Sequence, residues 1–324
     1  MTAKMKSVFS ARIAFALCLL GSLVLIPQVA AAGQQKVFET VEAASAALIQ
    51  AAEDGDAAVM MEIFGPDGID LVKTGDPVLD RNQAAEFAAE ARIKTQLVWN
   101  PEHPEIVTLE VGDDDWPLPI PIVKEEGKWR FDTKAGRQEM LYRRIGRNEL
   151  LAIEICRGFV EAQYDYAQTK HGDSRINQYA QTIISTPGTR DGLAWQTEDG
   201  TWEGPVGEAA ARVIAEGYTE RYTPYHGYYF KVLTGQGSAA PMGEMDFVVD
   251  DVMIGGFALA AAPSDYEVTG VMTFIVSHNG IVYQKDLGPE SVELFRSMEL
   301  YNPDDTWSPV PAQPPSSQYH PPAQ

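Results

Sequence analysis

The 324-residue sequence has few cysteines, since Cys18 and Cys156 are the two in the chain. If the N-terminal leader described below is removed, Cys156 remains alone and no disulfide within the chain can form. Cys156 lies in an apolar helical stretch, so we expect it to be buried as a small hydrophobic side chain. A nucleophilic cysteine would need a neighbouring base and access to solvent. Hydrophobic cores must therefore stabilise the fold, and the 292 residues after the leader are enough for two.

Basic residues are also scarce: 25 Lys and Arg against 46 Asp and Glu give a formal net charge of −21. The leader holds three basic residues and no acidic one, so its removal changes the charge from −21 to −24. A surface this acidic repels phosphate backbones and anionic lipid headgroups, which argues against nucleic-acid and membrane-surface partners. It is compatible with cationic partners or metal cations. The simpler interpretation is that the charge keeps the protein in solution.

Local motifs of common catalytic and cofactor sites are missing. The sequence has no G-x-S-x-G nucleophile elbow, phosphate-binding loop or dinucleotide-binding glycine pattern. The histidines outside the C-terminal tail make no metal-ligand spacing; they are His103, His171, His226 and His278. We therefore expect no cofactor and no metal. Catalysis stays open as an alternative, because groups brought together from distant segments leave no local motif.

The sequence begins with a leader. Three basic residues precede fourteen uncharged ones, Ile13–Ile26, and Ala30–Ala32 fits a small-x-small cleavage site. This pattern is typical of a secretory signal peptide, so residues 1–32 are predicted to be removed. An uncleaved anchor would offer roughly 21 Å of apolar helix against a bilayer core of roughly 30 Å. We predict a protein without a membrane anchor after cleavage, located in the periplasm or secreted.

The first part of the mature sequence predicts three helices. Thr40 can cap the first helix, and Gly55 with Asp56 can end it and cap the second. The second helix should stop at Gly65, which precedes a proline. A third helix is expected to begin at Asp80, where a glutamine three residues later resembles a capping box.

Strands are predicted after these helices. Val107–Val111 alternates apolar and polar residues, as a half-buried strand does. Alternate prolines in Trp116–Val123 allow only an edge strand or an extended segment, and Lys128–Asp132 is a further strand. Residues 33–137 are thus predicted to form an N-terminal α+β domain. Its order of elements is similar to the cystatin-like cone, in which helices wrap a curved sheet.

From about Arg137 the pattern is helical for some thirty residues. Its apolar positions follow a 3-4 spacing: Leu141, Ile145, Asn148, Ala152, Ile155, Phe159, Ala162 and Tyr166. Leu151 and Cys156 widen this stripe, which favours packing inside a globular domain over a two-stranded coiled coil.

The remaining sequence predicts a mostly β region. Residues 172–204 are polar and turn-rich and predict irregular structure, followed by a short helix at 208–216. Strands are predicted at 228–233, 247–249 and 257–261. Asn279-Gly280, between two alternating runs, predicts a hairpin with a type I′ turn.

The predicted architecture is therefore α+β. A second domain, residues 138–302, combines the long helix with an antiparallel sheet. Residues 303–324 are rich in Pro, Ser and Gln and predict a disordered tail.

Several blocks resemble an uncharacterised family of exported bacterial proteins, domain of unknown function 2950. The blocks are VGDDDWPLPIP (111–121), WRFDT (129–133), RRIGRNEL (143–150), GYYFKVL (227–233), GGFAL (255–259), GVMTFIV (270–276) and YQKDLG (283–288). The resemblance implies export and a two-part layout, but no activity. The C-terminal part is also similar to the globular region of type IV pilins and pseudopilins. It differs in that the corresponding helix is internal and amphipathic, so assembly through that helix is not implied.

Two acidic clusters are candidate cation sites. Asp113–Asp115 could bind a hard cation such as Ca²⁺, but it lacks the alternating spacing of a Ca²⁺ loop. We favour a solvated turn, and we interpret Asp246, Asp250 and Asp251 in the same way.

A cluster of arginines is a candidate anion site. Arg143, Arg144 and Arg147 lie near Glu149 and follow Asp132. They could bind an anion or carboxylate through their forked guanidinium groups. In so acidic a protein we favour ion pairs that join the last strand to the long helix.

An aromatic segment is a candidate carbohydrate or peptide groove; it contains Tyr218, Tyr222, Tyr225, His226, Tyr228, Tyr229 and Phe230. The favoured interpretation is a set of half-buried strand aromatics and a turn.

These observations favour an exported bacterial envelope protein that binds a partner or has a structural role. Its partner would be an unidentified envelope protein or a small ligand. The candidate binding residues are Trp116, Trp129, Asp132, Arg143, Arg147 and Tyr228. The alternative is a periplasmic hydrolase with its site in the concave face of the N-terminal domain, near Trp116, Trp129 and Asp132.

Overall fold

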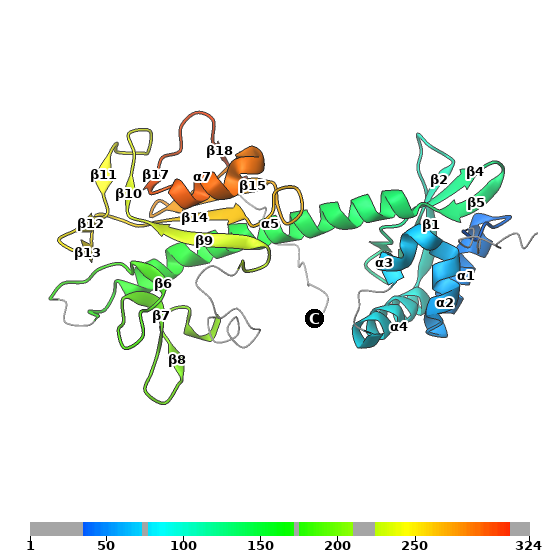
Figure 1. The fold of residues 1–324 in the computed structure, drawn as a ribbon, viewed down its shortest axis with the longest axis horizontal. Coiled ribbons are helices and arrows are strands. Elements are labelled where there is room, and N and C mark those ends of the chain that lie inside the picture. Colours follow the sequence, from blue (N-terminus) through cyan, green and yellow to red (C-terminus); the bar gives the residue numbers. More distant parts are fainter. Residues whose placement is uncertain (1–34, 73–76, 172–174, 210–223, 312–324) are drawn as a thin grey trace, which may run out of the picture.

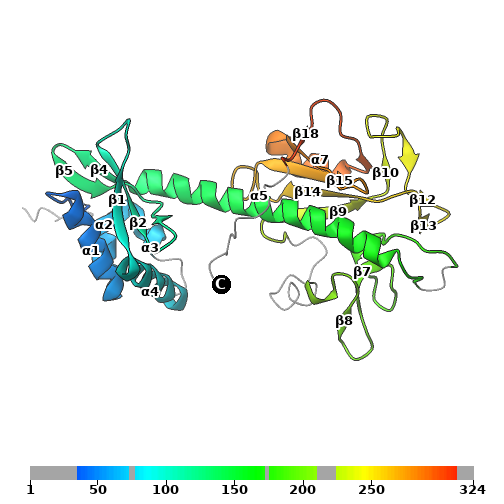
Figure 2. The ribbon, with the colours of Figure 1, turned by 180° about the vertical axis from the view of Figure 1, so that it is seen from behind.

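The computed structural model describes residues 35–72, 77–171, 175–209 and 224–311. Two bodies are joined by one long helix, α5 (Thr133–Tyr166), as Figures 1 and 2 show from opposite sides. Each body has its own cluster of buried hydrophobic residues. Helices packed against antiparallel sheets confirm the predicted α+β class. The predicted leader lies outside the described residues.

The N-terminal body begins with helices whose ends follow the predicted caps. The Thr40 hydroxyl accepts a hydrogen bond from the Ala43 amide at the start of α1 (Val41–Glu53). Asp56 accepts two at the start of α2 (Ala57–Phe64), which ends at Gly65 with φ 76°. A 3₁₀ turn, η1 (Pro66–Gly68), and a short helix, α3 (Ile69–Val72), follow.

The third predicted helix, α4 (Pro77–Ile93), starts earlier than expected. Asp80 lies inside its first turn and not at the cap. Proline suits the first helical position because its φ is already fixed near the helical value and its missing N–H is not needed there.

The sheet of this body is antiparallel, in the order β1-β2-β4-β5, with β3 paired to β2. Its strands are β1 (Thr95–Trp99), β2 (Ile106–Val111), β3 (Trp116–Pro117), β4 (Ile122–Glu125) and β5 (Lys128–Phe131). Alternate residues of β2 are buried, as its pattern predicts. The prolines restrict β3 to two residues at the edge. β1 was not predicted from the sequence.

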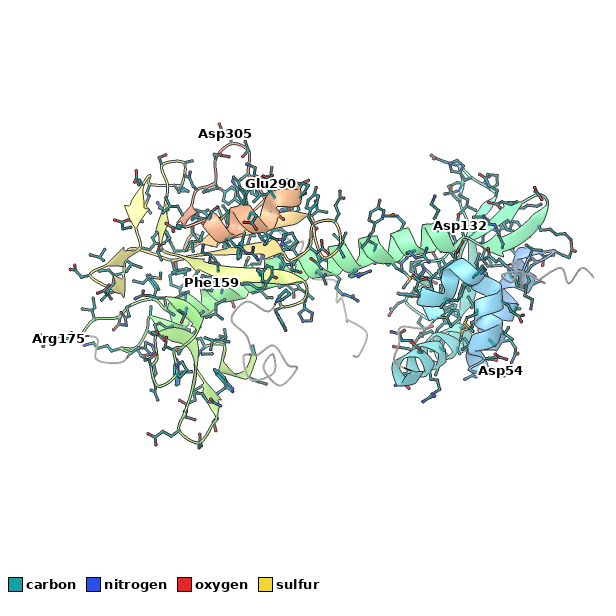
Figure 3. All side chains as sticks on the ribbon, viewed as in Figure 1. Asp54, Asp132, Phe159, Arg175, Glu290 and Asp305 are labelled. Atoms are coloured by element: carbon teal, nitrogen blue, oxygen red, sulfur yellow. The ribbon has the colours of Figure 1, made fainter. Side chains whose placement is uncertain are left out.

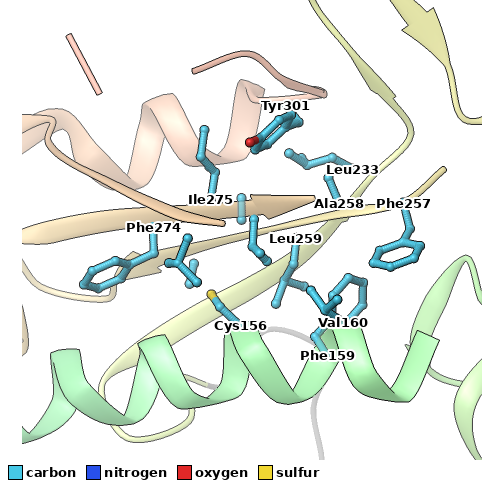
Figure 4. Packing of buried hydrophobic residues seen from close by; sticks show 14 of the residues in the cluster. Cys156, Phe159, Val160, Leu233, Phe257, Ala258, Leu259, Phe274, Ile275 and Tyr301 are labelled. Atoms are coloured by element: carbon cyan, nitrogen blue, oxygen red, sulfur yellow. The ribbon is translucent and has the colours of Figure 1, made fainter. Parts of the chain in front are cut away.

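Helix α5 begins at Asp132, whose carboxylate accepts a hydrogen bond from the Ala135 amide. The helix start therefore precedes the predicted boundary at residues 137/138, which falls inside α5. Cys156 is fully buried in the packing face, as predicted. Figure 4 shows Cys156, Phe159 and Val160 beside the central strands of the C-terminal body.

The C-terminal body is built on an antiparallel sheet in the order β18-β16-β15-β14-β9. Its strands are β9 (Tyr228–Leu233), β14 (Ala258–Pro263), β15 (Met272–Ser277), β16 (Val282–Asp286) and β18 (Ser308–Pro309). Every residue of β14 is buried, and both α5 and α7 (Ser291–Ser297) contact this strand. Its alanines leave room for close helix packing.

Smaller elements complete this body. They are β10 (Gly235–Gln236), β11 (Met245–Asp246), β12 (Val248–Val249), β13 (Val252–Met253), η2 (Gly288–Glu290) and β17 (Leu300–Tyr301).

Residues 303–311 were expected to belong to a disordered tail. Instead, β18 pairs with β16, and the Val310 amide donates to the Val282 carbonyl. The rest of the tail lies outside the described residues.

The region predicted to be irregular contains a small sheet, so this prediction was wrong. β6 (Thr182–Ile184) pairs in parallel with β7 (Gly192–Gln196), and β8 (Trp202–Glu203) pairs antiparallel with β7. The Gln163 side chain of α5 is fully buried and exchanges two hydrogen bonds with the backbone of Ala180. This anchor holds the segment against α5. Most of the helix predicted at 208–216 lies outside the described residues.

The hairpin between β15 and β16 is confirmed, but its type I′ turn is wrong. The Gly280 amide donates to the Ser277 carbonyl, which places His278 and Asn279 at the centre of the turn. Gly280 has φ 75°, whereas Asn279 is not among the described residues with positive φ. The arrangement fits the longer loop in which a glycine follows the turn. A type I′ turn requires positive φ at both of its central residues. Glu126 and Gly127, which form the loop between β4 and β5, both have positive φ.

Candidate functional site

The candidate site lies on α5 between the two bodies, on the side of the helix away from its buried residues. We call this side the outward face of α5. We call the site the neck patch and define it as Trp116, Met140, Arg143, Arg144, Arg147 and Leu150. Figure 3 shows where α5 leaves the N-terminal body at Asp132 and where it packs in the C-terminal body at Phe159. Met140, Arg143, Arg147 and Leu150 follow intervals of three, four and three residues, so they share one side of the helix.

Trp116 and Arg143 form the best-defined contact of the patch. The Arg143 guanidinium lies over the Trp116 ring, 5.6 Å from its centroid. Its Nη1 donates to the Pro117 carbonyl at 2.7 Å, and its Nε donates to Glu139 Oε1 at 2.8 Å. These contacts fix the arginine, while the Trp116 ring stays 44% exposed. A flat aromatic ring held in place can contact a partner with little further loss of conformational entropy.

Arg144 and Arg147 are both exposed. Within the described residues neither makes an ion pair with a carboxylate, in contrast to Arg137, which pairs with Asp70. Met140 and Leu150 are 39% and 53% exposed beside them. The patch therefore combines arginine, tryptophan and methionine on one accessible face, which are residue types enriched in protein interfaces.

The predicted ion-pair cluster of these arginines with Glu149 and Asp132 is not formed. Glu149 Oε1 instead accepts hydrogen bonds from the amides of Val271 and Met272, at 2.9 and 3.0 Å. Asp132 caps α5. Of the three arginines, Arg143 has a carboxylate partner, Glu139, one turn before it on the same helix.

Asn148 and Glu149 attach α5 to the C-terminal body, and we call their contacts the helix lock. Asn148 Nδ2 donates to the Thr269 carbonyl at 2.9 Å, next to the two bonds of Glu149. A side chain at Gly270 would clash, because its Cβ would lie 2.1 Å from the Tyr228 hydroxyl. Residues 148 and 149 thus fix the helix on the loop that leads into β15.

Tyr228 has a structural position. It is 1% exposed, and its hydroxyl donates to the Met272 carbonyl at 2.9 Å. Burial, with a smaller contribution from the charge of Glu149, raises the pKa of Tyr228 far above its ordinary value. The rest of the aromatic segment is divided: Tyr229 packs near Phe295, and Tyr218 and Tyr222 lie outside the described residues.

Trp129 and Asp132 also have structural roles. Trp129 is 6% exposed, packs edge-on against Trp99 with ring centroids 5.6 Å apart, and exchanges two backbone hydrogen bonds with Phe38. Asp132 is used as the helix cap. Of the three residues that the hydrolase alternative relied on, Trp116 is the one that is exposed, at 44%.

The acidic clusters lie in turns, except for Asp246, which belongs to β11. Asp115 has φ 52° and pairs with Lys94. Asp250 and Asp251, with φ 49° and 63°, are the two residues of the loop between β12 and β13. Within the described residues, no three His, Cys, Asp or Glu side chains come together as ligands for one metal ion.

Among the described residues, no contact joins Cys156 to a histidine that could act as its base. Burial raises the pKa of the Cys156 thiol to about 12, so it is protonated at neutral pH. His171 stacks on Tyr166, with ring centroids 3.7 Å apart, and its Nε2 lies 2.7 Å from the Tyr166 carbonyl oxygen. His278 lies against the rings of Phe247 and Phe257, and burial lowers its pKa.

Trp116, Arg143, Arg144 and Arg147 were among the candidates named from the sequence, whereas Met140 and Leu150 were not. A sequence pattern that could have identified them is the 3-4-3 spacing of Met140, Arg143, Arg147 and Leu150, which places these residues on the side of α5 opposite its buried face. A partly charged stripe is easily taken for a solvated helix face.

Comparison with known proteins gives a family and no activity. Within the described residues, no helix combines the length and the apolar character needed to cross a membrane. No curated protein and no solved structure matches the chain, so the cystatin-like and pilin-like resemblances stay predictions. The family model described as "Protein of unknown function (DUF2950)" matches residues 35–310. The chain therefore belongs to the DUF2950 family.

Proposed function

We propose that this chain is an exported bacterial envelope protein, periplasmic or secreted, that acts by binding another molecule and not by catalysis. The observation that carries the proposal is the neck patch, where Arg143 holds an exposed Trp116 ring and two further arginines lie within one helical turn. The leader pattern of residues 1–32 supports export.

The arrangement of the two bodies supports a role in binding. Helix α5 is anchored in the N-terminal body by the Arg137–Asp70 ion pair and the Arg143–Pro117 hydrogen bond. The helix lock anchors it in the C-terminal body. The patch thus lies on a continuous helix fixed at both ends, and a rigid element preserves the spacing of its side chains when a partner binds.

Co-purification from the envelope of the producing bacterium tests this proposal. Tagged full-length protein and its Arg144→Glu/Arg147→Glu variant should be recovered in the periplasmic or secreted fraction in equal amounts. We expect a partner that co-purifies with the wild type and is lost with the variant.

A matched control carries the same change in net charge elsewhere. Arg81 and Arg175 are exposed residues of α4 and of the C-terminal body, and Arg81→Glu/Arg175→Glu should retain the partner. Equal recovery of every co-purifying molecule with all three proteins would contradict the neck patch as the binding surface. Recovery of all three in the cytosolic fraction would contradict export.

A further inference from the structure

The neck patch is a cationic region in a strongly acidic protein. The patch contains three arginines in a chain of net charge −21, and Glu139 pairs with one of them, Arg143. Arg144 and Arg147 have no carboxylate partner among the described residues, although the chain has 46 acidic side chains. Within the part of the chain that the structure describes, no carboxylate therefore uses their charge.

The order of side chains along the patch indicates which kind of anionic partner it fits, since apolar residues flank the arginines. The exposed Met140 and Leu150 lie at its two ends, about 15 Å apart along the helix at about 1.5 Å per residue. The arginines lie between them. A surface complementary to the patch has carboxylates in its middle, because guanidinium groups bind carboxylates through paired hydrogen bonds. It has an apolar group at each end, to pack against Met140 and Leu150.

Two other partners fit this order less well. A phosphate polymer satisfies the arginines but leaves Met140 and Leu150 in water. A second copy of the chain, pairing α5 with α5 about a two-fold axis, places the same patch on both sides of the contact. Arginines would then face arginines, and like charges brought together oppose association.

We infer that the neck patch binds an acidic amphipathic segment of another protein, which packs along the outward face of α5. This inference rests on the proposed function and names the partner class for the same surface. The short-range contacts between the arginines and carboxylates are screened by salt, which makes the association dependent on ionic strength.

Binding of a defined peptide tests the partner class. The probe is a fluorescently labelled helical peptide with glutamates in its central two turns and leucines on the same face at both ends. We expect saturable binding to the full-length mature protein, measured by anisotropy, that weakens as NaCl is raised from 50 to 300 mM. Arg144→Glu/Arg147→Glu should weaken it by about tenfold or more, whereas Arg81→Glu/Arg175→Glu should leave it within about twofold.

The apolar ends give a second, independent readout. A peptide of the same composition with its leucines moved to the opposite face should bind about tenfold more weakly to the wild type. Both peptides should bind the double variant Met140→Ala/Leu150→Ala with similar affinity, because it lacks the apolar side chain at each end of the patch. Circular dichroism melts should show that each variant keeps the fold, since all changes are at exposed positions and Glu and Ala are good helix formers.

Three results would overturn the inference. The first is no patch-dependent peptide binding. The second is polyphosphate that binds as tightly as the peptide and is insensitive to Leu150→Ala. The third is a dimer of the free protein in sedimentation velocity that Arg144→Glu/Arg147→Glu dissociates. If the peptide fails while a partner still co-purifies through the patch, the partner class is wrong and the proposed function stands. If both fail, both are wrong.

Discussion

Replacing Glu149 by alanine should destabilise the C-terminal body. The Glu149 carboxylate accepts the amide hydrogens of both Val271 and Met272, at the start of β15. Alanine leaves these two donors without their acceptor. An unsatisfied donor costs about 1–3 kcal/mol, and Glu149 is half-buried, so water can reach part of the site. We expect a loss of about 2–4 kcal/mol in the free energy of unfolding.

Two matched variants separate the hydrogen bonds from other effects. Glu149→Gln keeps an oxygen acceptor and loses the charge, so it should cost about 1 kcal/mol. Glu154→Ala removes an exposed carboxylate of the same helix and should change stability by less than about 0.5 kcal/mol.

Urea unfolding measures these changes, followed by far-UV circular dichroism and by tryptophan fluorescence. If the two bodies unfold separately, the transition of the C-terminal body should shift and that of the N-terminal body should stay. Equal stability of Glu149→Ala and Glu154→Ala would refute the helix lock. A single transition that shifts as a whole would instead show that α5 couples both bodies into one cooperative unit.

Three further predictions concern the core, the hairpin and the leader. Cys156, fully buried and with a pKa of about 12, should react with a thiol reagent at pH 8 only on unfolding, and fast labelling of the native protein would contradict its burial. Gly280→Val should destabilise the protein by about 1–2 kcal/mol because a β-branched residue is strained at φ 75°, and Gly280→Asn should be milder. Nothing lies within 4 Å of a Cβ at Gly280, so equal melts for the two variants would mean that the backbone strain is absent. Intact-mass analysis of the exported protein should show an N-terminus at Gly33, and a mass that includes Met1 would contradict cleavage.

Helix boundaries set by local interactions were predictable from the sequence. Thr40, Asp56 and Gly65 act within one turn of their own positions, so their roles follow from residue type and spacing. The buried stripe of α5 was equally readable, because one helix presents a regular face whatever packs on it. Its polar member, Asn148, could be placed on that face but its acceptor, the Thr269 carbonyl, could not.

Elements that depend on distant partners were not predictable. β1 pairs along its whole length with β2, and its own five residues lack a clear alternation of buried and exposed positions. β6 is short and pairs in parallel with β7; β7 contacts α5, and β6 contacts β9. The turn near Gly280 differed from the expected type because the strand pairing ends at Val276 and Val282, which leaves a longer loop.

In the candidate site, too, the chemistry of a residue could be predicted from the sequence, but its contacts with distant elements could not. Trp116, Arg143 and Arg147 were named from their chemistry, but Trp129, Asp132 and Tyr228 were named on the same grounds and turned out to be used by the fold. Residue type alone does not separate these two groups, since the distinction lies in burial and in hydrogen-bond partners that come from other elements.

Site-specific photo-cross-linking in the intact envelope tests the central claim most directly. A photoreactive amino acid in place of Arg147 should give a discrete cross-linked product, whereas the same amino acid in place of Arg81 should give none. Mass spectrometry of the product should identify a partner segment that is rich in acidic and apolar residues. No product from position 147, or the same products from both positions, would contradict the claim that the outward face of α5 is the binding surface.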